Sequence, residues 1–217
     1  RKDFNVSVSV CYYDRFDDDK FLVEAMACID GKTDGMVIVP VTLELTKQVT
    51  DRLHGESIPF VLLDSYMPDL HPLAFFGQDS FASGYFAARM LMLLARNESE
   101  IMLMKMTKGG RIVSKQQENR EVGFRHYMHD HFPKTKMCTL ELPFYGNKVQ
   151  YDAIFEDFFK MKPMIHHCIT MGSKAHVLGD FLLRTNRRDV QIMGYDMVEK
   201  NVECLRKGSI SFLIAQH

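Results

Sequence analysis

Polar side chains that could bind a ligand rich in hydroxyl groups follow the strands that the sequence predicts. Each stands at or just past the carboxyl end of a strand, which is the edge where an open α/β sheet binds its ligands. A carboxylate can accept from two neighbouring hydroxyls, and an arginine can donate two parallel hydrogen bonds. The set consists of Asp64-Ser65, Gln78-Asp79, the cluster from Gln116 to Arg120, Gly172-Ser173, Asp196 and Gln216.

Helix capping is the alternative role for the aspartates of this set. Asp79 precedes a predicted helix that starts near Phe81, and Asp196 precedes one that starts near Glu199. Aspartate is a common N-cap, because its carboxylate accepts from the first backbone N–H groups of a helix. For each aspartate alone both roles stay open, and the coincidence of several polar residues at strand ends favours a binding site.

The sequence contains no motif for catalysis, a cofactor or a metal. It lacks the phosphate-loop and dinucleotide fingerprints and the nucleophile elbow, and Lys108-Gly109-Gly110-Arg111 is interpreted as a flexible loop. A cysteine–histidine pair stays open on spacing alone. Three clusters could suggest a metal, and each has a reason against it. Asp17-Asp18-Asp19 lacks the ligand pattern of a calcium loop, and His126 with His129 and Asp130 lacks a Cys or Glu partner at zinc-motif spacing. His166-His167-Cys168 lies in a predicted strand, where neighbouring side chains point to opposite faces. We therefore expect no enzyme, no cofactor and no metal site.

Strands alternate with helices along the whole chain, which is typical of doubly wound parallel sheets. Many of the strands are short, continuous apolar runs, as expected of strands buried on both faces. The break at residues 108–111 divides the chain and suggests two sheets. The predicted strands cover residues 6–12, 36–40, 59–63, 73–77, 100–106, 137–142, 164–170, 190–195 and 210–215, and helices fill the intervals, beginning with one that Asp19 would cap.

The composition is that of a globular protein without a nucleic-acid-binding surface. The chain has 217 residues, 46% of them hydrophobic and 25% charged, and a net charge of −1. It lacks the basic excess of a nucleic-acid-binding domain and any apolar run long enough to span a bilayer. The five cysteines are unpatterned, which favours reduced, buried thiols and the cytoplasm.

Four segments, in order, resemble motifs of the lac-repressor (LacI/GalR) family and its periplasmic sugar-binding relatives. Residues 78–88 resemble the family's Asp-Asn…Gly…Ala segment, and residues 120–124 resemble its Arg-x-x-Gly-Phe helix. Residues 194–196 are similar to its Gly-Phe/Tyr-Asp strand end. Residues 201–216 resemble the family's ending, an Asn followed by Gly-x-Ile and a final Gln.

This resemblance implies roles for individual residues. In the family, aspartate, arginine, aspartate and glutamine at these places bind the sugar, which implies ligand-binding roles for Asp79, Arg120, Asp196 and Gln216. Gln116 falls where repressors contact ligand, and Phe144 or Tyr145 falls near the loop that supplies a ring to stack on the sugar. The chain departs from the family at Gly172-Ser173, where an Asn-Asp pair is usual. The missing amide argues against an ordinary hexose or ribose ligand.

The resemblance also implies an α/β fold of two doubly wound parallel-sheet lobes, periplasmic-binding-protein-like and without the DNA-binding head. We expect lobes at about 1–105 and 106–215, with 216–217 beginning the return to the first lobe. The chain would be the effector-binding core of a cytoplasmic, homodimeric transcription regulator that closes on a small polyhydroxy ligand and has no membrane contact. DNA would bind only through the absent head. A periplasmic sugar-binding or sensor protein is the alternative, and an enzyme of this architecture is the least favoured reading.

The first lobe is expected to lack its central strand. In a doubly wound sheet of this type the first strand lies between the strands predicted at 6–12 and 36–40. Without it, the apolar run Met36–Pro40 would carry an unpaired edge. We therefore expect that a strand and helix precede Arg1 in the intact protein and that a further segment follows His217.

Overall fold

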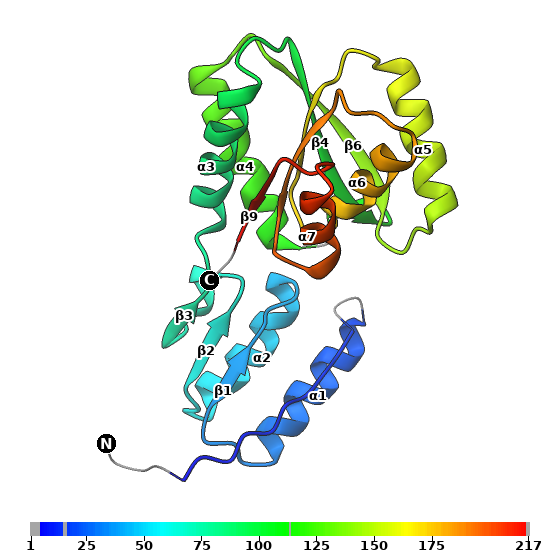
Figure 1. Ribbon diagram of the computed structural model, residues 1–217. Coiled ribbons are helices and arrows are strands. Elements are labelled where there is room, and N and C mark those ends of the chain that lie inside the picture. Colours follow the sequence, from blue (N-terminus) through cyan, green and yellow to red (C-terminus); the bar gives the residue numbers. More distant parts are fainter. Residues whose placement is uncertain (1–4, 15–16, 113, 216–217) are drawn as a thin grey trace. The chain divides into compact units, whose positions relative to one another are not determined.

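The computed structural model describes residues 5–14, 17–112 and 114–215 (Figure 1). The chain divides into two units, residues 1–77 and 78–217, and each is described by itself. Among the helices of the described residues, none is both long and apolar enough to cross a membrane.

The first unit contains a three-stranded parallel sheet and two helices. The strands β1 (Met36–Ile38), β2 (Phe60–Leu63) and β3 (Ala74–Phe76) lie in that order. Helix α1 (Asp18–Asp30) is capped by Asp17, two residues before the predicted Asp19, and Thr42 caps α2 (Leu43–Gly55). The core joins both helices to one face of the sheet, the face of Ile38 and Leu62. Val37 and Leu63, predicted to be buried, are therefore exposed.

The strand predicted at residues 6–12 does not form. This segment pairs with no strand among the described residues, and its alternating valines and Tyr12 are exposed. The prediction was wrong because alternating apolar residues make a strand only where a neighbouring backbone completes the ladder. On the described residues, β1 pairs with β2 alone. The expected central strand stays a prediction.

The second unit is built on a six-stranded sheet. Its parallel strands lie in the order β6 (Lys136–Pro143), β4 (Glu100–Lys108), β7 (His167–Thr170), β8 (Gln191–Tyr195) and β9 (Phe212–Ile214). The short strand β5 (Arg111–Ile112) returns antiparallel to the end of β4. The chain thus starts in the middle of the sheet, moves to β6, and then crosses back to β7. This is the doubly wound order that brings functional residues to the carboxyl ends of the central strands.

Five helices cover the two faces of this sheet. Helices α3 (Ser80–Leu94) and α4 (Lys115–His131) pack on each other on one side. Helices α5 (Lys148–Met161), α6 (Ala175–Arg184) and α7 (Glu199–Arg206) lie on the other side (Figure 1). Right-handed crossovers require this division, because the chain reverses its direction of travel after β6. The core between α3, α4 and the sheet includes Leu91, Phe124 and Leu103.

The expected boundary between residues 105 and 106 does not coincide with the division at 77–78. β4 pairs with β6 and β7, so residues 100–108 belong to the second sheet. The Gly109-Gly110 break, taken as a boundary, is the turn of the β4–β5 hairpin, and both glycines have positive φ. An apolar strand has the same sequence pattern in either sheet, so the sequence could not show to which sheet this strand belongs.

Two glycines let α3 and α4 approach backbone to backbone. A Cβ on Gly84 would lie 1.9 Å from the carbonyl oxygen of Arg120, and one on Gly123 would lie 2.0 Å from that of Phe81. No side-chain rotation can relieve such contacts, because the clashing atoms belong to the helix backbones. The close crossing fixes the position of Arg120 beside the first turns of α3.

Gly84→Ala is expected to destabilise the second unit by about 1–3 kcal/mol, because the added methyl forces the two helices apart. Gly179→Ala in α6 is the matched control, since its nearest new contacts would be side chains of Ser209 and Cys204 at 3.1–3.2 Å. These can shift, so the control should lose less. Urea unfolding followed by circular dichroism measures both, and equal losses would contradict the backbone contact.

Candidate ligand-binding site

Arg120 is a fully buried cation at the carboxyl edge of the second sheet. It lies in the second turn of α4, and its side chain is 1% exposed. Its Nη1 donates to the carbonyl oxygen of Met171, which follows β7, at 3.1 Å. Its guanidinium lies 4.0 Å from the ring centre of Tyr195, the last residue of β8. A buried guanidinium is costly unless its donors are used, so this position requires acceptors at the strand ends.

The ring of Tyr195 packs against the guanidinium of Arg120. Its hydroxyl donates to the carbonyl oxygen of Ser83 in α3 at 3.1 Å and lies 3.4 Å from the Ser83 hydroxyl. Burial raises the pKa of Tyr195, so its ring stays neutral beneath the cation. The ring thereby ties the end of β8 to α3 and holds Arg120 between them.

Asp196 stands just past β8 in a strained backbone conformation. Its φ is +71°, a region that residues other than glycine seldom occupy. Its N–H donates to the carbonyl oxygen of Ile214 in β9 at 2.9 Å. The N-cap position of α7 is Val198 and not Asp196, and Val198 makes no side-chain cap hydrogen bond. The strain is typical of positions that the surrounding structure holds for a function.

Asn201 holds the loops after β7 and β8 together, a role that the sequence analysis did not assign. It is fully buried in α7. Its Nδ2 lies 2.9–3.0 Å from the carbonyl oxygens of Ser173, Tyr195 and Asp196. Its Oδ1 accepts from the backbone N–H of His176 at 2.9 Å. One amide thus fixes the positions of both loops at the candidate site.

Asp79 does cap a helix, as its alternative role proposed. Its Oδ1 accepts from the N–H of Ala82 at 2.9 Å at the start of α3. The side chain is exposed, and its second oxygen makes no hydrogen bond within the described part of the chain. Capping and ligand binding are compatible here, because the cap uses one carboxylate oxygen.

Two aromatic rings follow β6 at the same edge of the sheet. Phe144 and Tyr145 contact each other at a ring-centre distance of 5.1 Å. The ammonium of Lys174 lies 4.0 Å from the centre of Phe144, and that of Lys108 lies 5.3 Å from the centre of Tyr145. Tyr145 is 64% exposed, whereas Phe144 is half-buried. The exposed ring is the better platform for a ligand.

The structure therefore brings most of the predicted residues to one edge of the second sheet. Gln116 is buried in the first turn of α4, one turn before Arg120. Arg120, Asp196, Phe144 and Tyr145 lie at or beside the ends of β6, β7 and β8. Gln216 lies outside the described residues. Their roles in binding remain predictions.

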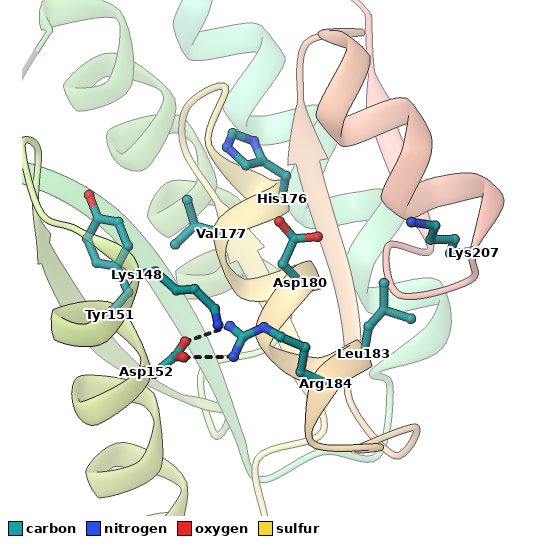
Figure 2. Close-up of a pocket in the computed structure, with 9 residues that line it drawn as sticks. All are labelled: Lys148, Tyr151, Asp152, His176, Val177, Asp180, Leu183, Arg184 and Lys207. Atoms are coloured by element: carbon teal, nitrogen blue, oxygen red, sulfur yellow. Dashed lines mark hydrogen bonds and ion pairs between the residues drawn. The ribbon is translucent and has the colours of Figure 1, made fainter.

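A cavity of about 490 Å³ lies on the helical layer formed by α5, α6 and α7 (Figure 2). Three of the charged side chains that line it are already paired. Arg184 donates to both carboxylate oxygens of Asp152, at 2.7 and 2.6 Å, and Lys207 pairs with Glu203. The cavity is lined by helices and not by strand ends, which makes it a weaker candidate than the sheet edge.

Asp152→Asn is expected to cost at most about 1 kcal/mol at neutral pH, because the pair with Arg184 is partly exposed. The hydrogen bonds from Arg184 lower the pKa of Asp152 below its usual value. The pair stabilises the fold above the pKa of an unfolded aspartate, about 3.9, and this contribution disappears as the pH falls through the lowered folded value. Urea unfolding of both proteins at pH 7 and near pH 2.5 should show a larger difference at pH 7 than at the lower pH.

The described residues offer little support for metal or thiol chemistry. Among them, no group of three or more His, Cys, Asp or Glu side chains could hold a metal ion. All five cysteines are free, but only Cys168 and Cys204 are buried, which corrects the expectation that all are. Burial raises the pKa of the Cys204 thiol to about 11, and that of Cys168 further, so both stay protonated at neutral pH.

A family model described as the periplasmic binding protein domain matches residues 1–217. The chain belongs to the periplasmic-binding-protein family. Within this family, a structure described as a candidate LacI transcriptional regulator from Bacteroides fragilis is 42% identical, with a TM-score of 0.92. That match covers 98% of this chain and 73% of the other. The resemblance to the LacI type and the expected α/β fold of parallel sheets are thereby confirmed.

Other members share the fold at lower identity. A glucose-galactose binding protein from Geobacillus stearothermophilus is 19% identical, with a TM-score of 0.76 and coverage of 91% of this chain and 69% of the other. A carbohydrate-transporter solute-binding protein from Agrobacterium radiobacter, solved with D-arabinose, is 19% identical, with a TM-score of 0.75 and coverage of 93% and 68%. No curated protein sequence matches the chain.

Proposed function

We propose that this chain is the effector-binding core of a LacI-type transcriptional regulator. It binds a small hydroxyl-rich ligand, a sugar or sugar derivative, at the carboxyl edge of the second sheet. Ligand binding closes two lobes and changes the DNA affinity of the intact protein. The observation that carries the proposal is the 42% identity over 98% of the chain to a candidate LacI regulator.

The site chemistry supports a polyhydroxy ligand. Arg120 supplies a rigid, buried donor group whose position is fixed by Met171 and Tyr195. Asp196 and Asp79 supply carboxylates, and Tyr145 supplies an exposed ring. Donors, acceptors and a stacking face together match the surface of a sugar. Binding rather than catalysis also agrees with the description of the family.

In the proposed arrangement the protein is a cytoplasmic homodimer. DNA binds through a head outside this chain, and the core only biases that head between two states. The free cysteines favour the cytoplasm. Gln216 completes the ligand set in this proposal.

A panel of mono- and oligosaccharides in a thermal-shift assay tests ligand binding. A ligand at a hundred times its dissociation constant stabilises the folded protein by about 2.7 kcal/mol. At least one sugar or sugar derivative should raise the melting temperature, and calorimetry should then give a stoichiometry of one per chain. If no sugar in the panel raises the melting temperature and calorimetry detects no heat of binding, the result would count against the proposal.

A periplasmic sugar-binding protein is the second candidate, because several transporter-associated sugar-binding proteins share the fold. The two candidates differ in what precedes this chain in the intact protein. A basic helix-turn-helix supports the regulator, and a signal peptide supports the transport protein. Sequencing the intact reading frame decides between them.

A further inference from the structure

A small hollow lies at the point where the order of the second sheet reverses. β4 and β7 are neighbours, but the chain leaves β4 towards β6 through α4 and leaves β7 towards β8 through α6. Ligands of doubly wound sheets bind in the crevice at such a reversal. The hollow has a volume of about 10 Å³, and its polar lining is Lys105, Gln117, Thr170 and Lys174. That volume suits about one water-sized group.

Lys174 brings an ammonium group to this hollow without a carboxylate partner. Its Nζ donates to the carbonyl oxygen of Phe144 at 2.7 Å and lies over the ring of the same residue. Within the described parts of the chain, no Asp or Glu lies within ion-pair distance of it. Burial alone lowers the pKa of Lys174. Two of the three ammonium donors are left for a ligand.

The other amine at the hollow is already neutralised. Lys105 lies 3.2 Å from Glu121 and 3.7 Å from Glu141. The excess positive charge at the hollow therefore belongs to Lys174. An anionic group bound here would have one cation as its partner, which suits a single carboxylate better than a doubly charged phosphate.

Gln117 adds an acceptor beside this cation. Its Oε1 is buried and has no hydrogen-bond partner among the described residues. The amide packs against Gly172, where a Cβ would lie 3.0–3.3 Å from the amide atoms. A buried acceptor without a donor is unfavourable unless a ligand supplies one. A hydroxyl next to a carboxylate would supply both missing partners.

We infer that this hollow receives one carboxylate oxygen of the ligand and that the ligand is a sugar acid, such as a uronic or aldonic acid. One carboxylate oxygen binds Lys174, and a neighbouring hydroxyl donates to Gln117. Lys174 is then the specificity-determining residue of the site. The inference rests on the proposed binding of a hydroxyl-rich ligand. It also accounts for the departure at Gly172-Ser173, because Gly172 leaves room for the Gln117 amide.

Calorimetric titration of the purified full chain with matched pairs tests the inference: glucose against glucuronate, galactose against galacturonate, and glucose 6-phosphate as the phosphate arm. At least one uronate should bind about tenfold or more tightly than its neutral parent, as expected for a charge-assisted hydrogen bond. Lys174→Met should reduce that preference to about twofold or less. Lys174→Arg should retain the preference.

Lys148→Met is the matched control, since this exposed lysine lines the cavity on α5 and α6 and should leave all affinities unchanged. The melting temperature of each variant shows that it is folded. Neutral sugars that bind as tightly as the uronates would overturn the inference and leave the proposed function standing. A preference that survives Lys174→Met, or tighter binding of the phosphate, would overturn it as well. Failure of every sugar and sugar acid to bind would overturn the proposed function with it.

Discussion

Arg120→Ala should remove at least about 2 kcal/mol of ligand-binding free energy, and up to about 5 kcal/mol, because one side of a buried charged hydrogen-bond pair is lost. The dissociation constant would rise roughly 30-fold or more. The guanidinium is 1% exposed and held by Met171 and Tyr195, so it is ordered before the ligand arrives. Calorimetry with the tightest sugar or sugar acid measures the effect.

Two further variants separate binding from folding. Arg120→Lys keeps the charge but loses the planar fork, and should also weaken binding. Arg125→Ala is the control. Arg125 lies more than one turn further along the same helix, and its partly exposed side chain pairs with Glu121. This variant should bind the ligand normally. Unchanged affinity in Arg120→Ala would exclude the ligand role. A large fall in melting temperature without ligand would show that Arg120 is structural instead.

Asn201→Ala should destabilise the second unit by about 3 kcal/mol, because several buried backbone groups lose their partner at once. The carbonyl oxygens of Ser173, Tyr195 and Asp196 would be left without the amide, as would the N–H of His176. Ligand affinity should fall too, even where the variant is folded, because the loops after β7 and β8 lose their fixed spacing.

Asn97→Ala is the matched control for Asn201→Ala. Asn97 is exposed in the same unit and should change stability by no more than about 0.5 kcal/mol. Urea unfolding followed by circular dichroism compares the two variants. A loss below about 1 kcal/mol for Asn201→Ala would mean that water replaces the amide and that the loops do not depend on it.

The second sheet could be predicted from the sequence almost completely. Its strands and the helices between them form close to the expected positions, as β6 and α4 show. The prediction of a strand at 6–12 was wrong, because alternating apolar residues form a strand only when a partner strand is present. The boundary expected at 105–106 differs from the division at 77–78, because the sequence of the strand at residues 100–108 does not indicate which sheet it joins.

The candidate site could be predicted only where a motif carried it. Arg120 and Asp196 were found through ordered motifs, and the structure places both at the expected sheet edge. Asn201 lies within one of these motifs, but a polar residue inside a short helix does not indicate the four backbone groups that it contacts. Lys174 gave no signal either, because its lack of a carboxylate partner depends on residues distant in the sequence.

The DNA affinity of the intact protein, measured with and without its tightest sugar or sugar acid, tests the central claim most directly. Fluorescence anisotropy of labelled operator DNA at fixed salt gives both dissociation constants. A ligand-coupled regulator should show a change of about 5- to 150-fold, the usual range of coupling between two sites, and Arg120→Ala should abolish the change. Identical affinities with and without a ligand that calorimetry shows to be bound would contradict the regulator.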